Sequence, residues 1–189
     1  MRNSYGTLVA VAAVLAAAQP ALASGLAQGQ AAKVAVATIQ PLGPSTVKGL
    51  VLFTPLDHGV EISVQLTGLT PGQHGFHVHE FGDCSAPDGS SAGPHFNPEG
   101  KPHGAPGADA SHAGDYGNLL ADSSGHATLK LVSHRITLDQ SATGVLGRSV
   151  IIHDKPDDLT SQPTGNAGGR IGCGVIVIQG DGTVPITKR

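Results

Sequence analysis

The sequence has few aromatic residues and no tryptophan: Phe, Tyr and Trp together make up 3% of its 189 residues. A hydrophobic core must therefore consist mainly of aliphatic side chains. The chain also has no excess of positive charge, because 11 Lys and Arg residues stand against 14 Asp and Glu residues, a net charge of −3. Nucleic-acid-binding domains carry clustered Lys and Arg, so we expect no nucleic-acid partner.

No apolar run is long enough to cross a membrane as a helix. The run at residues 8–18 has eleven residues, whereas a bilayer requires about 20. Arg2 precedes this run and Ala21-Leu22-Ala23 follows it, the pattern of a secretory signal peptide. We predict a signal peptide over residues 1–23, a flexible tether over 24–33 and one folded domain over 34–189. The mature protein is then exported, with the periplasm as its expected location and without an integral membrane span.

Cysteine is scarce as well. The two cysteines, Cys84 and Cys173, lie far apart in the sequence and lack the C-x-x-C spacing of zinc and redox motifs. Cysteines of exported proteins usually pair, so we expect one disulfide between them.

Glycine and proline, in contrast, are abundant, with 27 and 13 residues. Between them lie short segments in which apolar and polar residues alternate, as in Val60-Glu61-Ile62-Ser63-Val64, the period of a half-buried strand. Strands are predicted at 34–40, 46–53, 60–67, 74–81, 117–121, 127–132, 148–153 and 171–178. Eight strands predict an all-β sandwich or barrel. Two connections, 82–116 and 154–170, are too long for hairpins, and long loops of this kind are usually functional.

Histidine is concentrated in and beside the first of these loops. In the motif Gly75-Phe76-His77-Val78-His79-Glu80, the two imidazoles lie two residues apart and so share one face of a strand. His153 ends the apolar run 150–152, and His95 follows a Gly-Pro pair that can turn the loop back. Four imidazole ligands without sulfur favour Cu(II) in a tetragonal arrangement.

A second group of candidate ligands follows in the same loop. His95, His103, His112 and Asp115 have the composition of a closed tetrahedral zinc site. Each residue alone has an ordinary explanation as a polar loop or strand residue, but together they complete two ligand sets. The other histidines, at positions 58, 74, 126 and 134, are expected in turns or at exposed positions, without a role in metal binding.

Five motifs together resemble the copper/zinc superoxide dismutases, in particular the bacterial, exported type. They are Gly75-Phe76-His77-Val78-His79-Glu80, Gly93-Pro94-His95-Phe96-Asn97-Pro98, His112-Ala113-Gly114-Asp115, Gly165-Asn166-Ala167-Gly168-Gly169-Arg170 and Cys173-Gly174-Val175. The resemblance covers residue 34 to the C-terminus. It implies an eight-stranded Greek-key β-barrel, related to the β-sandwiches, with a long metal loop and a long electrostatic loop.

The resemblance also implies a role for each candidate residue. His77, His79 and His153 match ligands of copper alone, and His95 matches the ring that bridges copper to zinc. The other zinc ligands are then His103, His112 and Asp115. Asp157 matches a carboxylate that orients one ligand of each metal from behind, and Arg170 matches the active-site arginine that attracts the anionic substrate.

The reaction implied by the resemblance is the dismutation of superoxide to O2 and hydrogen peroxide, an antioxidant defence outside the cytosol. Copper alternates between Cu(II) and Cu(I), while zinc, whose d shell is filled, holds His95 without redox chemistry. His95 is expected to deliver a proton to the leaving peroxide. The 154–169 loop lacks the charged cluster that animal members carry before the arginine, so the sequence identifies no steering residue besides Arg170.

Two other functions are compatible with part of this pattern. A copper-binding or copper-delivery protein on the same fold would bind the metal without turnover, although such relatives often lack a copper ligand or the arginine. A zinc hydrolase would need a carboxylate base, and Glu80, one residue after His79, faces the opposite side of its strand. The sequence leaves monomer and homodimer both open.

Overall fold

Eight antiparallel strands form most of the folded part of the chain. The computed structural model describes Met1 and residues 33–179, so the predicted signal peptide and nearly all of the tether lie outside the described residues. The strands are β1 (Ala35–Pro41), β2 (Lys48–Leu56), β3 (Gly59–Thr67), β4 (Gly72–His79), β5 (Asp115–Ala121), β6 (Ala127–Ser133), β7 (Ser149–His153) and β8 (Arg170–Ile178). Each lies within a few residues of a strand predicted from the alternation of apolar and polar residues.

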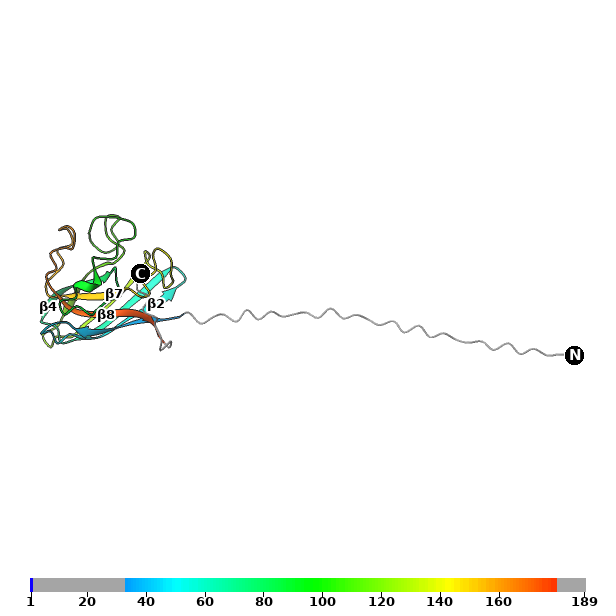
Figure 1. Cartoon of the computed structure of the whole chain (residues 1–189), viewed down its shortest axis with the longest axis horizontal. Coiled ribbons are helices and arrows are strands. Elements are labelled where there is room, and N and C mark those ends of the chain that lie inside the picture. The colour runs from blue at the N-terminus through cyan, green and yellow to red at the C-terminus, as the bar shows by residue number, and fades with distance from the viewer. Residues whose placement is uncertain (2–32, 180–189) are drawn as a thin grey trace. The chain divides into compact units, whose positions relative to one another are not determined.

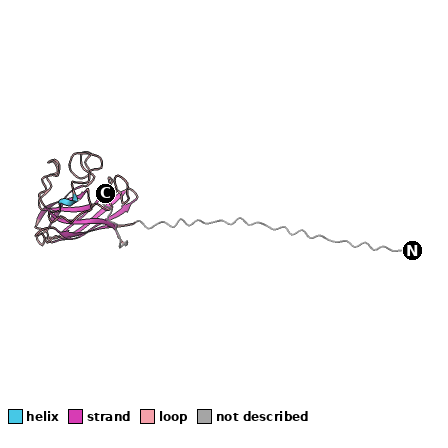
Figure 2. Ribbon diagram, in the orientation of Figure 1, coloured by secondary structure: helices cyan, strands magenta, loops and turns pink. Residues whose placement is uncertain are grey.

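The strands close into a barrel, as predicted. Their order around the barrel is β1-β2-β3-β6-β5-β4-β7-β8, and β8 pairs with β1 to complete the ring. Figure 2 shows the strands in magenta, with loops connecting them. Strands that are neighbours in sequence pair at five places around the barrel, whereas the β3–β6, β4–β7 and β1–β8 pairs join strands that are distant in sequence. The β4–β7 pair is the one that matters for the site, because it lays His77 and His79 beside the strand that ends at His153.

The barrel interior is aliphatic, as the composition requires. In β3, Val60, Ile62 and Val64 are almost completely buried, while the residues between them are only partly covered. Burial of each such side chain contributes roughly 1.5–3 kcal/mol of hydrophobic free energy. Phe53 and Phe76 complete this core and are fully buried.

Two long connections lie outside the barrel wall. The β4–β5 connection contains a short 3-10 helix, η1 (Ser90–Ala92), and the β7–β8 connection spans residues 154–169. In Figure 1 the green region near residue 105 and the orange-brown region near residue 160 rise on the same side of the strands. Among the described residues, no helix is long and apolar enough to span a membrane.

A disulfide attaches the first of these connections to the barrel. Cys84, in the β4–β5 connection, is bonded to Cys173 in β8, at a sequence separation of 89. This is the pairing that the cysteine count predicts for an exported chain. The bond packs against Leu42, Ala92 and Ile151 in a small apolar cluster outside the main core.

Candidate metal centre

Strands β4 and β7 carry three of the candidate ligands on the outer side of the barrel wall. Phe76 and Val78 point into the core, so His77 and His79, which alternate with them, point the other way. The long connections cover that outer face, and both histidines are buried to 1% exposure or less. His153, the last residue of β7, is 3% exposed.

Four ring nitrogens converge at this point. Nδ1 of His77 and Nε2 of His79, His95 and His153 are buried, and none has a hydrogen-bond partner. The four side chains offer ligand atoms that all lie within 4.8 Å of one another. Buried polar atoms in folded proteins nearly always have a partner. Four orphaned nitrogens directed at one point therefore fit a metal ion with four imidazole ligands.

The opposite nitrogen of each ring is tied to a protein oxygen, which fixes how the ring is turned. His77 Nε2 lies 2.8 Å from Asp157 Oδ2, and Nδ1–H of His79 donates to the Gly93 carbonyl at 2.9 Å. His95 Nδ1 lies 2.8 Å from Asp115 Oδ1. Such outer partners orient the rings of metal-binding histidines in proteins generally.

A second cluster shares His95 with the first. It consists of His95, His103, His112 and Asp115, whose ligand atoms also lie within 4.8 Å of one another. Asp115 Oδ1 is 2.8 Å from Nδ1 of His95 and 3.2 Å from Nδ1 of His112, and its Oδ2 is 3.0 Å from Nδ1 of His103. Three nitrogens and a carboxylate match the donors that zinc accepts. The two nitrogens of His95 thus belong to different clusters.

Asp157 connects the two clusters from behind. Its carboxylate accepts hydrogen bonds from Nε2 of His77, in the first cluster, and from Nε2 of His103, in the second, at 2.8 and 2.9 Å. Its backbone is held by Asn118, which accepts from the Asp157 N–H at 2.7 Å and donates to the Asp157 carbonyl at 2.9 Å. Asp157 therefore holds one side chain of each cluster through its carboxylate.

Burial keeps the first cluster neutral near pH 7. Removal from water lowers the pKa values of His77, His79 and His153 below the ordinary value of 6.5, and lowers that of His95 to about 4. Neutral imidazoles are acceptors, the state in which they bind metals. The rings are therefore ready to bind without first losing a proton.

His103 behaves in the opposite way. Burial favours its neutral form, but hydrogen bonds to Asp115 and Asp157 outweigh that effect and raise its pKa to about 9. In the protein without metal, His103 accordingly carries a positive charge between two carboxylates. Burial likewise opposes ionisation of Asp115, yet its bonds from His103 and His112 hold its pKa well below the ordinary value. A cation in the second cluster would take the place of that proton.

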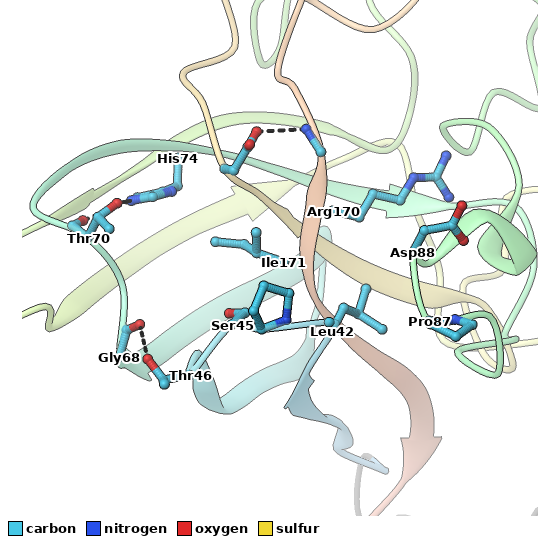
Figure 3. A pocket seen from close by; sticks show the side chains of 14 residues that line it. Leu42, Ser45, Thr46, Gly68, Thr70, His74, Pro87, Asp88, Arg170 and Ile171 are labelled. Atoms are coloured by element: carbon cyan, nitrogen blue, oxygen red, sulfur yellow. Dashed lines mark hydrogen bonds between the residues drawn. The ribbon is translucent and has the colours of Figure 1, made fainter.

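The expectation for His74 was wrong. We expected it in a turn or at an exposed position, but it is 2% exposed at the end of the barrel. Its Nδ1–H donates to the His153 carbonyl at 2.8 Å. Its Nε2 lies 2.8 Å from the carbonyl of Thr70, the residue that faces it in Figure 3. His74 has the same strand parity as the core residues Phe76 and Val78, the signal that could have revealed its burial. It fixes the backbone from which a cluster residue projects.

Arg170 is half-buried at the start of β8, beside the β4–β5 connection. Its guanidinium donates to the carbonyl of Gly89 at 2.6 Å and to that of Gly93 at 2.7 Å. Its side chain borders a groove of about 710 Å³, with Asp88 beside it (Figure 3). The β4–β5 connection, which the disulfide attaches to the barrel, thus holds the positively charged guanidinium of Arg170 next to the segment that precedes His95.

Glu80 lies away from the clusters, as predicted from its strand parity. It pairs with Arg148, whose Nη1 lies 2.7 Å from the Glu80 carboxylate and whose guanidinium carbon lies 3.8 Å above the Phe96 ring. No base for a zinc hydrolase is therefore provided by Glu80. Asn118, and Gln162, whose amide bonds the backbone of His103, gave no signal in the sequence, because an amide that binds backbone leaves no characteristic spacing.

The structure is an eight-stranded β-barrel with two adjoining groups of buried side chains that could each hold a metal ion and that have His95 in common. The family model described as copper/zinc superoxide dismutase (SODC) matches residues 47–176. Among solved structures, one described as "Crystal Structure Analysis of the clock protein EA4" aligns at 41% identity and a TM-score of 0.71, covering 78% of this chain and 96% of that chain. The chain belongs to the copper/zinc superoxide dismutase family.

Proposed function

We propose that this protein dismutates superoxide to O2 and hydrogen peroxide. Copper would be held by His77, His79, His95 and His153, and zinc by His95, His103, His112 and Asp115, the two groups whose ligand atoms lie close together. The observation that carries this proposal is the set of four orphaned ring nitrogens, one of them on a ring whose other nitrogen faces the second cluster. A single structural zinc site needs neither the second set of donors nor the shared ring.

When bound, copper supplies one-electron redox chemistry and zinc supplies a fixed positive charge without redox chemistry. The protein side chains attract the substrate and hold the proton that is transferred. Arg170, fixed by two carbonyl groups, attracts and orients the superoxide anion. His95 Nε2 is the atom at which a proton is held before it passes to the leaving peroxide.

We also propose that the protein works outside the cytosol, in the periplasm. The disulfide between Cys84 and Cys173 supports export, because such bonds persist in oxidising compartments. Residues 1–23 are proposed as the signal peptide. The substrate is superoxide itself, a small anion that needs no large binding pocket.

A role in metal binding without turnover is the second candidate function. It is favoured by one observation, the similarity to a structure described as a clock protein rather than as an enzyme. Both candidates require the clusters to bind metal, so metal content alone cannot separate them. The rate of superoxide decay in the presence of the loaded protein does separate them.

The decisive experiment measures superoxide decay by stopped-flow absorbance with protein loaded with copper and zinc. We expect rapid catalysis by the wild type, none by His153→Ala, and zinc retained in that variant because His153 belongs only to the first cluster. The matched control is His126→Ala, since His126 is an exposed histidine that belongs to neither cluster. Loaded wild-type protein that leaves superoxide decay unchanged would favour the role without turnover.

A further inference from the structure

The segment that carries His103 has no strand to support it. Residues 98–110 contain no helix or strand, although the His103 side chain is fully buried between Asp115 and Asp157. A backbone held only by turns samples many conformations, and ordering each residue costs roughly 1–2 kcal/mol of conformational entropy. Something else must hold the His103 backbone where Nδ1 faces Asp115.

Gln162, in the β7–β8 connection, does this with its side-chain amide. The His103 N–H donates to Gln162 Oε1 at 2.8 Å, and Gln162 Nε2 donates to the His103 carbonyl at 2.9 Å. One side chain thus satisfies both backbone groups of one residue, as a neighbouring strand would in a sheet. Gln162 Nε2 also donates to the Thr160 carbonyl at 3.1 Å, which fixes the amide within its own loop.

Gly165, three residues later, covers the same histidine from another side. Its φ is +64°, and a Cβ at this position would overlap Asp157 Oδ1 and lie 2.6 Å from His103 Nε2. The Gly165 backbone therefore lies directly on the hydrogen bond between Asp157 and His103 and keeps water away from it. Hydrogen bonds are stronger in such dry surroundings. The segment 162–165 accordingly holds His103 both by its backbone and by its ring.

We propose that Gln162 is a positioning residue for the second metal site: it holds the backbone of His103 so that Nδ1 is presented to zinc. This inference rests on the proposed function, because it takes zinc as the occupant of that cluster. Gln162 touches no metal-binding atom and acts only through His103. Its loss is therefore expected to weaken zinc and to leave copper, which does not use His103, in place.

The test compares Gln162→Met with wild type and with Gln65→Met. Methionine keeps the length of the side chain and removes both hydrogen bonds, and Gln65 is a glutamine exposed on β3, remote in sequence from both clusters. Zinc release is followed with a chromophoric chelator and copper retention by metal analysis. A typical hydrogen bond is worth roughly two- to tenfold in an equilibrium constant. We expect Gln162→Met to release zinc about tenfold faster, with copper unchanged.

A second readout is independent of any metal. Amide hydrogen exchange of the metal-free protein reports on the His103 N–H, which Gln162 Oε1 protects. We expect faster exchange at His103 in Gln162→Met and slow exchange restored in Gln162→Glu, which keeps an acceptor oxygen. Gln65→Met should match wild type in both measurements.

Two results would overturn the inference. One is wild-type zinc release and wild-type His103 exchange in Gln162→Met. The other is loss of both metals together with a lower unfolding midpoint, which would show a general destabilisation. If the proposed function were wrong, the results would differ from both of these. Wild-type protein would then bind no zinc or leave superoxide decay unchanged, while amide exchange at His103 would still become faster in Gln162→Met.

Discussion

Replacing Asp157 by asparagine exchanges one carboxylate oxygen for an NH2 group and should weaken metal binding at both sites. Both carboxylate oxygens are used, one by His77 Nε2 at 2.8 Å and one by His103 Nε2 at 2.9 Å. Each ring donates an N–H, so two acceptors are required. Asparagine keeps one acceptor oxygen, and its NH2 group faces the second ring with a donor.

The size of the effect follows from these two contacts. A hydrogen bond to a charged group contributes about 1.5–3 kcal/mol, and outer partners of metal-binding histidines typically change metal affinity 10–100-fold. We expect the dissociation constants of both copper and zinc to rise by roughly 10–100-fold, because Asp157 serves one ring of each cluster. The assay is competition with chelators of known affinity, one metal at a time.

The neighbouring carboxylate provides a matched control. Asp158 is exposed and accepts hydrogen bonds from the backbone of Thr160 and Ser161, so Asp158→Asn makes the same chemical change beside the site and should leave both affinities near wild type. The reasoning is refuted if Asp157→Asn weakens neither metal, or if Asp158→Asn weakens both to the same extent.

Three further predictions concern the frame around the clusters. Replacing Cys84 and Cys173 by serine opens a loop that spans 89 residues and should lower the unfolding free energy by about 4–5 kcal/mol, read from urea denaturation. His74→Phe leaves the buried carbonyl of His153 without a partner, at a cost of about 1–3 kcal/mol, and should loosen copper before zinc, because His153 belongs only to the first cluster. Acid should destabilise the metal-free protein. The pKa of His95 is about 4 in the folded protein and about 6.5 in the unfolded chain. Above pH 6.5 the ring is neutral in both states, and the folded protein keeps its full unfolding free energy. As the pH falls toward 4, the unfolded chain takes up a proton that the folded protein does not, so the unfolding free energy decreases. Urea titrations at pH 7 and pH 4.5 should differ by at least about 2 kcal/mol, and equal midpoints would contradict the neutral state of the buried rings.

The strands could be predicted from the sequence because the barrel uses a simple rule. Val60, Ile62 and Val64 alternate with polar residues, and that period requires a strand with one buried face. The rule fails in β4, where the long connections cover the outer face and residues 74–79 are buried on both sides. The burial of His74 was not predicted for that reason. Its polar side chain suggested exposure, although its place in the alternation of β4 is on the side that faces the core.

The candidate ligands could be predicted as a set, but their arrangement could not. Spacing places His77 and His79 on one face of a strand, yet it cannot show which ring nitrogen is orphaned and which is held by a protein oxygen. Nor does spacing show that Gln162 reaches a backbone 59 residues away. Amide contacts to backbone depend on the path of a loop, and a loop without periodicity leaves no pattern to read.

On the proposed function, the ring of His95 is shared by two different metal ions. Diffraction from crystals of the loaded protein, with data collected on both sides of the copper and zinc absorption edges, tests it most directly. We predict a copper peak within bonding reach of His95 Nε2 and of the orphaned nitrogens of His77, His79 and His153. We predict a zinc peak at about 2.0–2.1 Å from His95 Nδ1 on the other side of the ring. A single metal peak, or two peaks of which either lies out of bonding reach of His95, would contradict the account.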